Sequence, residues 1–100
     1  MQHTIHLAAT SRITDWATTS PAHAQFVTTC INRHLRRNWG DLDPHDWAVN
    51  DRAVACHAGQ VLSAYTVPTE LDPVDRTMWI ITDDLHDPDS ATTVLWPSDY

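Results

Sequence analysis

The order of three apolar runs in the C-terminal part of this chain constrains its fold most strongly. The runs are rich in the β-branched, aromatic and aliphatic residues typical of strands, and they cover residues 60–67, 77–82 and 91–96. The loops between them hold prolines and aspartates, and each is too short for the helical crossover that a parallel pair needs. The sequence therefore predicts an antiparallel β-meander. A weak alternating pattern over residues 3–8 adds a fourth candidate strand.

Two helices are predicted ahead of the meander, each opened by a capping side chain followed by proline. Ser20 is placed to cap the first helix, and Pro21 fits its first position. The apolar stripe of this helix consists of pairs spaced four residues apart, Phe26-Val27, Cys30-Ile31 and His34-Leu35. Asp43 and Pro44 open the second helix, which we expect to end at Gly59.

The chain of 100 residues has room for a single domain, residues 1–100. Residues 9–20 are Thr- and Ser-rich and are expected to form a loop or an irregular packed segment. We expect both helices to bury their apolar stripes against one face of a three- to four-stranded antiparallel meander. This arrangement is an α+β domain in two layers.

The formal net charge of −7 comes entirely from the C-terminal third of the chain. Residues 1–65 carry five Arg and five Asp, whereas residues 66–100 carry one Arg against seven Asp and one Glu. Such a chain lacks the basic footprint needed for direct nucleic-acid binding or for an anionic membrane surface. It also shows no apolar run of about 20 residues and no signal-peptide pattern, so we expect a cytoplasmic protein.

Residues 83–90 form a loop that is unusually acidic, and we call it the acidic loop. Asp83, Asp84, Asp87 and Asp89 surround His86 in it. Carboxylates this close repel one another and favour a cation or a basic partner. Two interpretations stay open, which are a contact with the basic surface of a partner protein and a solvated loop between two strands.

Arg33, His34, Trp39 and Asp41 cluster where the first predicted helix ends. A contact from Arg33 or His34 to Asp41 would stabilise the corner between the two helices, and burial of Trp39 would stabilise it further. The same four residues could instead build a binding site on the corner. A structural and a functional interpretation of the corner therefore both stay open.

The seven histidines and two cysteines show no spacing typical of a zinc site, so we expect no metal and no cofactor. Residues 41–46 resemble the start of a calcium loop but lack its glycine and its final Glu. Cys30 and Cys56 are expected to stay reduced. Because Cys30 lies on the apolar stripe, its thiol should have a raised pKa and be inert.

Separate motifs run through the chain in a defined order. They are Phe26-Val27, Arg33-His34, Trp39-Gly40-Asp41-Leu42, Asp46, Asn50-Asp51, Gly59, Leu62-Ser63-Ala64-Tyr65, Trp79-Ile80-Ile81-Thr82-Asp83, Thr92-Thr93-Val94-Leu95, Pro97 and Asp99-Tyr100. In this order they resemble an uncharacterised bacterial family of small proteins labelled "plasmid-related protein", over residues 11–100. The resemblance implies a protein that is encoded on plasmids, phages and integrated elements and for whose family no activity is established. Arg37-Asn38 stands where the family has Gly-Asp, the family's Asp-Arg between the last two strands is missing, and the acidic loop is longer.

The favoured hypothesis is a small non-enzymatic interaction protein of a mobile genetic element. In its most concrete form, an acidic face occupies the nucleic-acid channel of a host restriction or CRISPR complex and inhibits it. One alternative is a structural module that forms a homodimer through residues 91–96 as an exposed edge strand. Another is a small metal-dependent hydrolase in which His34, Asp41 and His86 converge in one pocket.

Overall fold

The computed structural model describes residues 6–56, 59–74, 76–87 and 89–100 of the chain. This part holds three α-helices, four strands and a short 3-10 helix, with the bounds β1 His6–Ala9, α1 Ser11–Ala17, α2 Pro21–Leu35, α3 Pro44–Ala55, β2 Val61–Thr66, β3 Thr77–Thr82, β4 Ala91–Leu95 and η1 Pro97–Asp99. The α+β class is as predicted. Residues 3–5 of the predicted first strand lie outside the described residues, as do His57 and Pro88.

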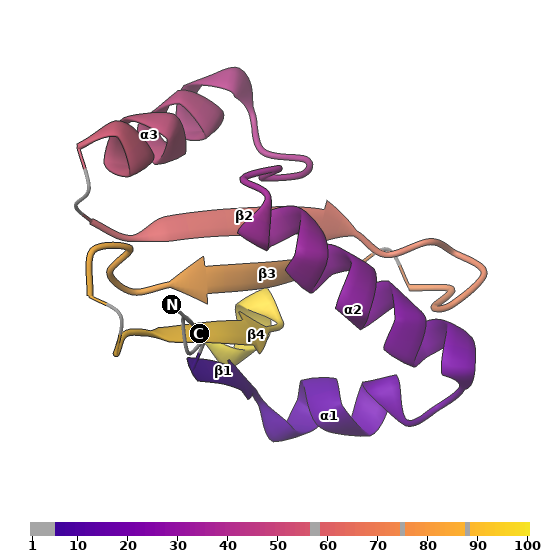
Figure 1. Cartoon of the computed structure of the whole chain (residues 1–100). Helices are drawn as coiled ribbons and strands as arrows, with labels where there is room; N and C mark the ends of the chain where they lie inside the picture. The colour runs from indigo at the N-terminus through magenta and orange to yellow at the C-terminus, as the bar shows by residue number, and fades with distance from the viewer. Residues whose placement is uncertain (1–5, 57–58, 75, 88) are drawn as a thin grey trace.

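The four strands form one mixed sheet in the order β1-β4-β3-β2 (Figure 1). β2, β3 and β4 pair antiparallel, as the short loops between them predict. β1 pairs in parallel with β4, so the prediction of a purely antiparallel sheet is wrong. Three helices and two strands separate β1 from β4 along the chain, which is ample length for a crossover that makes the two strands parallel. The short loops of the meander place no restriction on this pair.

β4 lies inside the sheet rather than at its edge. It pairs with β1 on one side and with β3 on the other. The exposed edge strand that the dimerisation hypothesis requires at residues 91–96 is therefore absent from the described structure. That route to a homodimer is closed, and a homodimer formed by another surface stays a prediction.

Side-chain caps open both predicted helices. The Ser20 hydroxyl accepts a hydrogen bond from the His23 N–H at 3.3 Å, and the Asp43 carboxylate accepts one from the Asp46 N–H at 2.9 Å. Each cap is followed by a proline, as the sequence indicates. The second helix ends at Ala55, ahead of its predicted end at Gly59.

Residues 11–17 form helix α1, where the sequence favours a loop. The Thr10 side chain caps this helix by accepting a hydrogen bond from the Ile13 N–H at 3.3 Å. Ile13 is buried in the core, and Trp16 packs against the same cluster. Two apolar residues make too short a pattern for periodicity to indicate a helix, so tertiary packing decides its formation.

The core lies between one face of the sheet and the helices α1 and α2. Its buried members are Ile13, Cys30, Tyr65, Val67, Met78, Ile80, Val94 and Trp96. The strand register brings Tyr65 opposite Met78 and Ile80 opposite Val94, so these four side chains share that face. We call it the core face, and the other face of the sheet the outer face.

α3 does not join the core face, contrary to the prediction that both expected helices cover it. It lies beside β2, at the opposite edge of the sheet from β1 (Figure 1). Its one buried residue is the polar Asn50, so it has no apolar stripe to bury there. Its Val49 lines a hollow together with Leu62 and Trp79, which point to the outer face.

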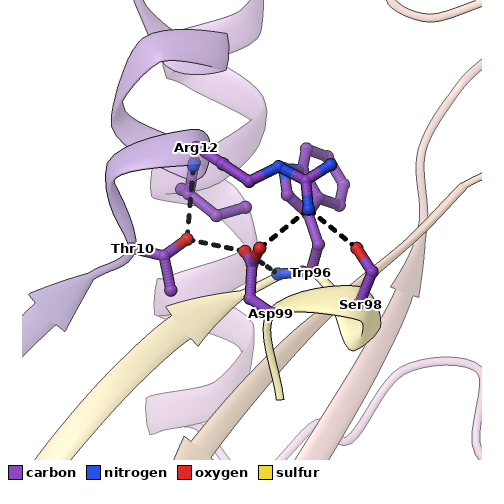
Figure 2. Close-up of polar contacts among 6 residues, drawn as sticks. Thr10, Arg12, Trp96, Ser98 and Asp99 are labelled. Carbon is purple, nitrogen blue, oxygen red and sulfur yellow. Dashed lines mark hydrogen bonds and ion pairs between the residues drawn. The ribbon is translucent and has the colours of Figure 1, made fainter.

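The start of α1 is tied to the C-terminal end of the chain, as Figure 2 shows. The Thr10 hydroxyl donates to the Asp99 carboxylate at 2.8 Å, and the Trp96 N–H donates to the same carboxylate at 3.1 Å. The Arg12 guanidinium donates to Asp99 and to the Ser98 hydroxyl, both at 2.9 Å. These contacts hold η1 against the helix that follows the first strand.

Candidate functional site

The turn after α2 is built on a residue with a left-handed backbone. Arg37 has a φ of 64°, and in the described part of the chain it is the only non-glycine residue with a positive φ. The Asn38 N–H donates to the Arg33 C=O at 2.8 Å, and the Arg37 N–H donates to the His34 C=O at 3.0 Å. This is the Schellman pattern, which usually has glycine at this position because a Cβ is unfavourable there.

The residues after this turn run along the outer edge of β2 and cover it. The Ala64 N–H donates to the Trp39 C=O at 3.1 Å, and the Asp41 N–H donates to the Ala64 C=O at 2.7 Å. The Asp41 carboxylate then accepts a hydrogen bond from the Thr66 N–H at 2.8 Å. These contacts take the place of a neighbouring strand, so the edge no longer invites pairing with another chain.

Asn50 extends this cover to the other end of β2. Its side-chain NH2 donates to the Leu62 C=O at 2.7 Å, and its Oδ1 accepts from the Leu62 N–H at 3.3 Å. The buried amide therefore imitates the peptide group of an adjacent strand. This polar pair helps to position α3 against the sheet, because Asn50 is the one buried residue of the helix.

Close packing fixes the corner between α2 and α3. Trp39 is 1% exposed, and its indole N–H donates to the Asp51 carboxylate at 2.9 Å. The Tyr65 hydroxyl donates to the Asn38 C=O at 2.7 Å, and the Arg33 guanidinium carbon lies 4.8 Å from the centre of the Tyr65 ring. The corner is thus closed by burial of two aromatic rings, each of which also donates one hydrogen bond, to the Asp51 carboxylate or to the Asn38 main chain.

The predicted contact from Arg33 or His34 to Asp41 is replaced by other contacts. Arg33 donates to the Asn38 side-chain oxygen at 3.2 Å, and both ring nitrogens of His34 bind hydroxyl groups. Asp41 follows the corner and lies alongside β2, where its carboxylate accepts a hydrogen bond from the Thr66 N–H. The sequence groups these residues correctly at one corner but cannot show which groups of the strand they meet.

His34 lies at the centre of a buried chain of polar side chains. Its Nδ1 is 2.5 Å from the Ser63 hydroxyl oxygen, and its Nε2 is 2.9 Å from the Thr82 hydroxyl oxygen. The Thr82 hydroxyl is in turn 2.9 Å from that of Thr92. All four side chains are buried, and Ser63 is 0% exposed. Every polar atom of this network therefore has a partner, as a buried polar group requires.

Burial lowers the pKa of His34 from its ordinary 6.5 to about 4. The imidazole is therefore neutral at neutral pH and shares its two hydrogen bonds with hydroxyl groups. Neither ring nitrogen is left for a substrate or a metal ion. The network joins α2 to β2, β3 and β4, and its chemistry is that of a core histidine whose hydrogen bonds are satisfied.

Ser63, Thr82 and Thr92 are the partners that sequence reasoning missed. Each occupies a position of its strand that points to the core face, and the next residue of that strand on the same face is apolar. The sequence offered one signal for them, namely hydroxyl residues at inward-facing strand positions together with a histidine on the apolar stripe of a helix. Alternation alone does not tell which inward residues face the histidine.

The acidic loop is folded by its own aspartates. The Asp84 carboxylate accepts a hydrogen bond from the His86 N–H, and the Asp87 carboxylate accepts one from the Asp89 N–H, both at 2.9 Å. The Ser90 hydroxyl accepts from the Asp84 N–H at 2.8 Å. The two carboxylates stay exposed while they accept these N–H groups, so Asp84 and Asp87 combine a structural role with an exposed charge.

Asp83 and Asp89 lie at the two ends of this acidic loop, and both are exposed. Asp89 is 3.8 Å from the imidazole of His6, which is a weak and exposed contact. Among the described residues no arginine forms an ion pair with the acidic loop. The four carboxylates of the acidic loop therefore carry their charge without a salt bridge to arginine within the described part of the chain.

An open hollow of about 190 Å³ lies between the acidic loop and the corner after α2. Asp84 and Asp87 line it on one side, and Arg37 and Trp39 on the other. The structure thus brings the acidic loop and part of the corner cluster, including an edge of His34, to one surface. Asp41 is outside this lining and faces the edge of β2.

The three residues of the hydrolase hypothesis have separate tasks in the described structure. His34 is buried between hydroxyl groups, Asp41 covers the β2 edge, and His86 is an exposed member of the acidic loop. No group of three His, Cys, Asp or Glu side chains among the described residues is placed to hold a metal ion. Cys30 and Cys56 are both free thiols.

Comparisons with family models, with curated proteins and with solved structures find no match to this chain. Within the described residues, none of the helices combines the length and the apolar character that a membrane crossing needs.

Proposed function

We propose that this protein is a non-enzymatic interaction protein that binds a basic surface of a partner protein through the acidic loop. The observation that carries the proposal is that the exposed carboxylates of Asp84 and Asp87 accept main-chain hydrogen bonds but form no ion pair with an arginine among the described residues. Asp84 and Asp87 each hold a turn of the loop and remain exposed. A pre-formed acidic surface costs little ordering on binding, and it attracts a basic partner at long range.

The contacts of the buried groups support a role without catalysis. His34 and Ser63 are buried, with only an edge of His34 at the hollow, and both nitrogens of the imidazole are hydrogen-bonded. Burial raises the pKa of the Cys30 thiol to about 12, so this group is not a nucleophile. The groups left at the surface of the acidic loop are suited to charge recognition.

We further propose that the protein acts in the cytoplasm as an accessory protein of a mobile genetic element. The resemblance of its ordered motifs to plasmid-related proteins supports this part. Host restriction and CRISPR complexes hold nucleic acid in basic channels, so an acidic protein that occupies such a channel would inhibit them. In this form the partner is a nucleic-acid-binding protein, and the protein itself does not contact nucleic acid.

The test is retention of bacterial nucleic-acid-binding proteins on the immobilised protein at about 0.05 M and about 0.5 M salt, which screen charges very differently. We expect specific retention at low salt that falls at high salt. The double variant Asp84→Asn, Asp87→Asn removes two charges while each amide oxygen can still accept the N–H that fixes its turn. It should retain clearly less partner than the wild type.

A matched control changes two exposed acidic residues away from the acidic loop, Asp15→Asn and Glu70→Gln. It alters the net charge by the same amount and should retain as much partner as the wild type. The proposal fails if the wild type retains no nucleic-acid-binding protein at low salt. It also fails if the two double variants lose retention equally.

A further inference from the structure

The outer face of the sheet carries an apolar groove beside α3. Leu62 and Trp79 point to this face, and together with Leu42 and Val49 they line a hollow of about 390 Å³. Apart from α3 at its edge, no α-helix in the described part of the chain covers this face, although the Tyr100 ring packs edge-on against Trp79 with the ring centres 6.1 Å apart. Val49 is 51% exposed although it belongs to the lining.

A second hollow lies next to the first and shares Leu42 with it. It measures about 440 Å³ and is lined also by Pro44, Trp47 and Ala48. The two hollows thus adjoin at the start of α3, through their shared residue Leu42. Together they offer apolar surface along one helix, which is the kind of surface that receives an amphipathic helix.

The charged residues of both hollows are acidic. Asp46 lines the first hollow and Asp51 lines the second, whereas no arginine lines either one in the described part of the chain. At the far end of the first hollow lies Gln60, and its neighbour Gly59 accepts a hydrogen bond from the Leu85 N–H of the acidic loop at 3.3 Å. The groove therefore leads from α3 toward the acidic loop.

We propose that this groove docks an amphipathic helix of the partner whose polar face is basic, with its apolar side chains between α3 and the outer face. This inference rests on the proposed function, because the same partner contacts the acidic loop with further basic residues. Apolar surface supplies the contact area, and Asp46 and Asp51 select positive charge at its rim. A neutral or acidic amphipathic helix is discriminated against by the same two carboxylates.

The test uses three labelled peptides of about 18 residues, with Leu at helical spacing and with Arg, Gln or Glu at the other positions. Binding is followed by fluorescence anisotropy, and the bound surface is mapped by amide chemical shifts. The Arg peptide should bind and shift Leu62, Trp79 and Val49, while the Gln peptide binds more weakly and the Glu peptide does not bind. Val49→Ser should weaken the Arg peptide about fivefold or more, given the usual gain from burying a valine.

The matched control is Val74→Ser, which changes a valine that is 58% exposed on the loop between β2 and β3, and it should leave binding unchanged. The inference is overturned if the Arg peptide fails to bind, if its shifts lie elsewhere, or if both valine variants bind equally well. It is also overturned if sedimentation shows a second copy on the groove, namely a dimer that Val49→Ser dissociates. The pulldown separates this inference from the proposed function. If the Asp84→Asn, Asp87→Asn variant loses the partner while Val49→Ser still retains it, the groove proposal is rejected and the acidic-loop proposal stands. If Val49→Ser loses the partner while the loop variant retains it, the acidic-loop proposal is rejected.

Discussion

The imidazole Nδ1 of His34 lies 2.5 Å from the hydroxyl oxygen of Ser63. This contact joins α2 to β2 in the centre of the molecule, where both side chains are buried. A charged imidazole is unfavourable in this position, because burial penalises the charged form and the ring's hydrogen-bond partners among the described residues are uncharged hydroxyl groups. The stability of the fold should therefore depend on pH through this one residue.

We predict that the free energy of unfolding falls as the pH is lowered from about 6.5 to about 4. The folded-state pKa of His34 is about 4 and the unfolded-state value is 6.5, so the unfolded chain binds the extra proton between these values. The stabilisation is complete above pH 6.5 and is lost as the pH falls. Its size is about 3 kcal/mol, from about 1.4 kcal/mol for each unit of pKa difference. Urea unfolding at a series of pH values measures it.

The variant His34→Gln separates this effect from the titration of the carboxylates. It should be less stable at pH 7 but should lose most of the pH dependence between 4 and 6.5. The control His45→Gln changes an exposed histidine and should keep the wild-type dependence. An unchanged slope in His34→Gln would show that another group is responsible.

Arg37→Gly is expected to stabilise the protein. Arg37 holds a φ of 64°, which costs an L-residue about 1–2 kcal/mol and glycine nothing. Part of the gain is offset by the larger entropy of glycine in the unfolded chain, so we expect about 0.5–1 kcal/mol net. Arg36→Gly is the control, because Arg36 has a φ of −88° and glycine there should lower stability. Melting temperatures of the two variants should move in opposite directions.

The helix caps and the meander could be predicted because their signals are local. Ser20-Pro21 and Asp43-Pro44 carry their meaning within four residues, and short loops force antiparallel pairing. The parallel pairing of β1 and the fold of α1 depend on partners that are almost ninety residues away in the chain, such as Asp99, which is 89 residues from Thr10. For the candidate site, the acidic loop was visible as composition, whereas the hollow beside it depends on how two distant loops pack.

Gly40→Ala should destabilise the protein strongly. A Cβ at this position would lie 2.1 Å from the Ala64 C=O oxygen and 2.6 Å from the Tyr65 ring, while the backbone has a φ of +79°. The bridge to β2 would have to open, so we expect a loss of about 3 kcal/mol or more. Gly59→Ala is the matched control, because it also has positive φ but its Cβ would meet only Ala53, at 3.9 Å. It should cost about 1–2 kcal/mol in the same denaturation experiment.

Asn50→Leu tests the cover of the β2 edge. The substitution keeps the size of the side chain but leaves the N–H and C=O of Leu62 without partners, which should cost about 1–3 kcal/mol. The freed edge should also increase association, seen as light scattering that rises with concentration. Asn32→Leu, at an exposed position of α2, adds the same apolar group and should do neither. Equal behaviour of the two variants would mean that Asn50 does not protect the edge.

The two thiols should differ widely in their rate of alkylation. Cys56 is exposed, whereas Cys30 is 1% exposed and burial raises its pKa to about 12, so its thiolate is scarce and inaccessible. With iodoacetamide at pH 8, mass spectrometry should find Cys56 modified first and Cys30 more than about a thousandfold more slowly, through unfolding. In urea the two rates should converge. Modification of Cys30 at a comparable rate in the native protein would mean that α2 separates from the sheet without global unfolding, and the core between them would then be less stable than its packing indicates.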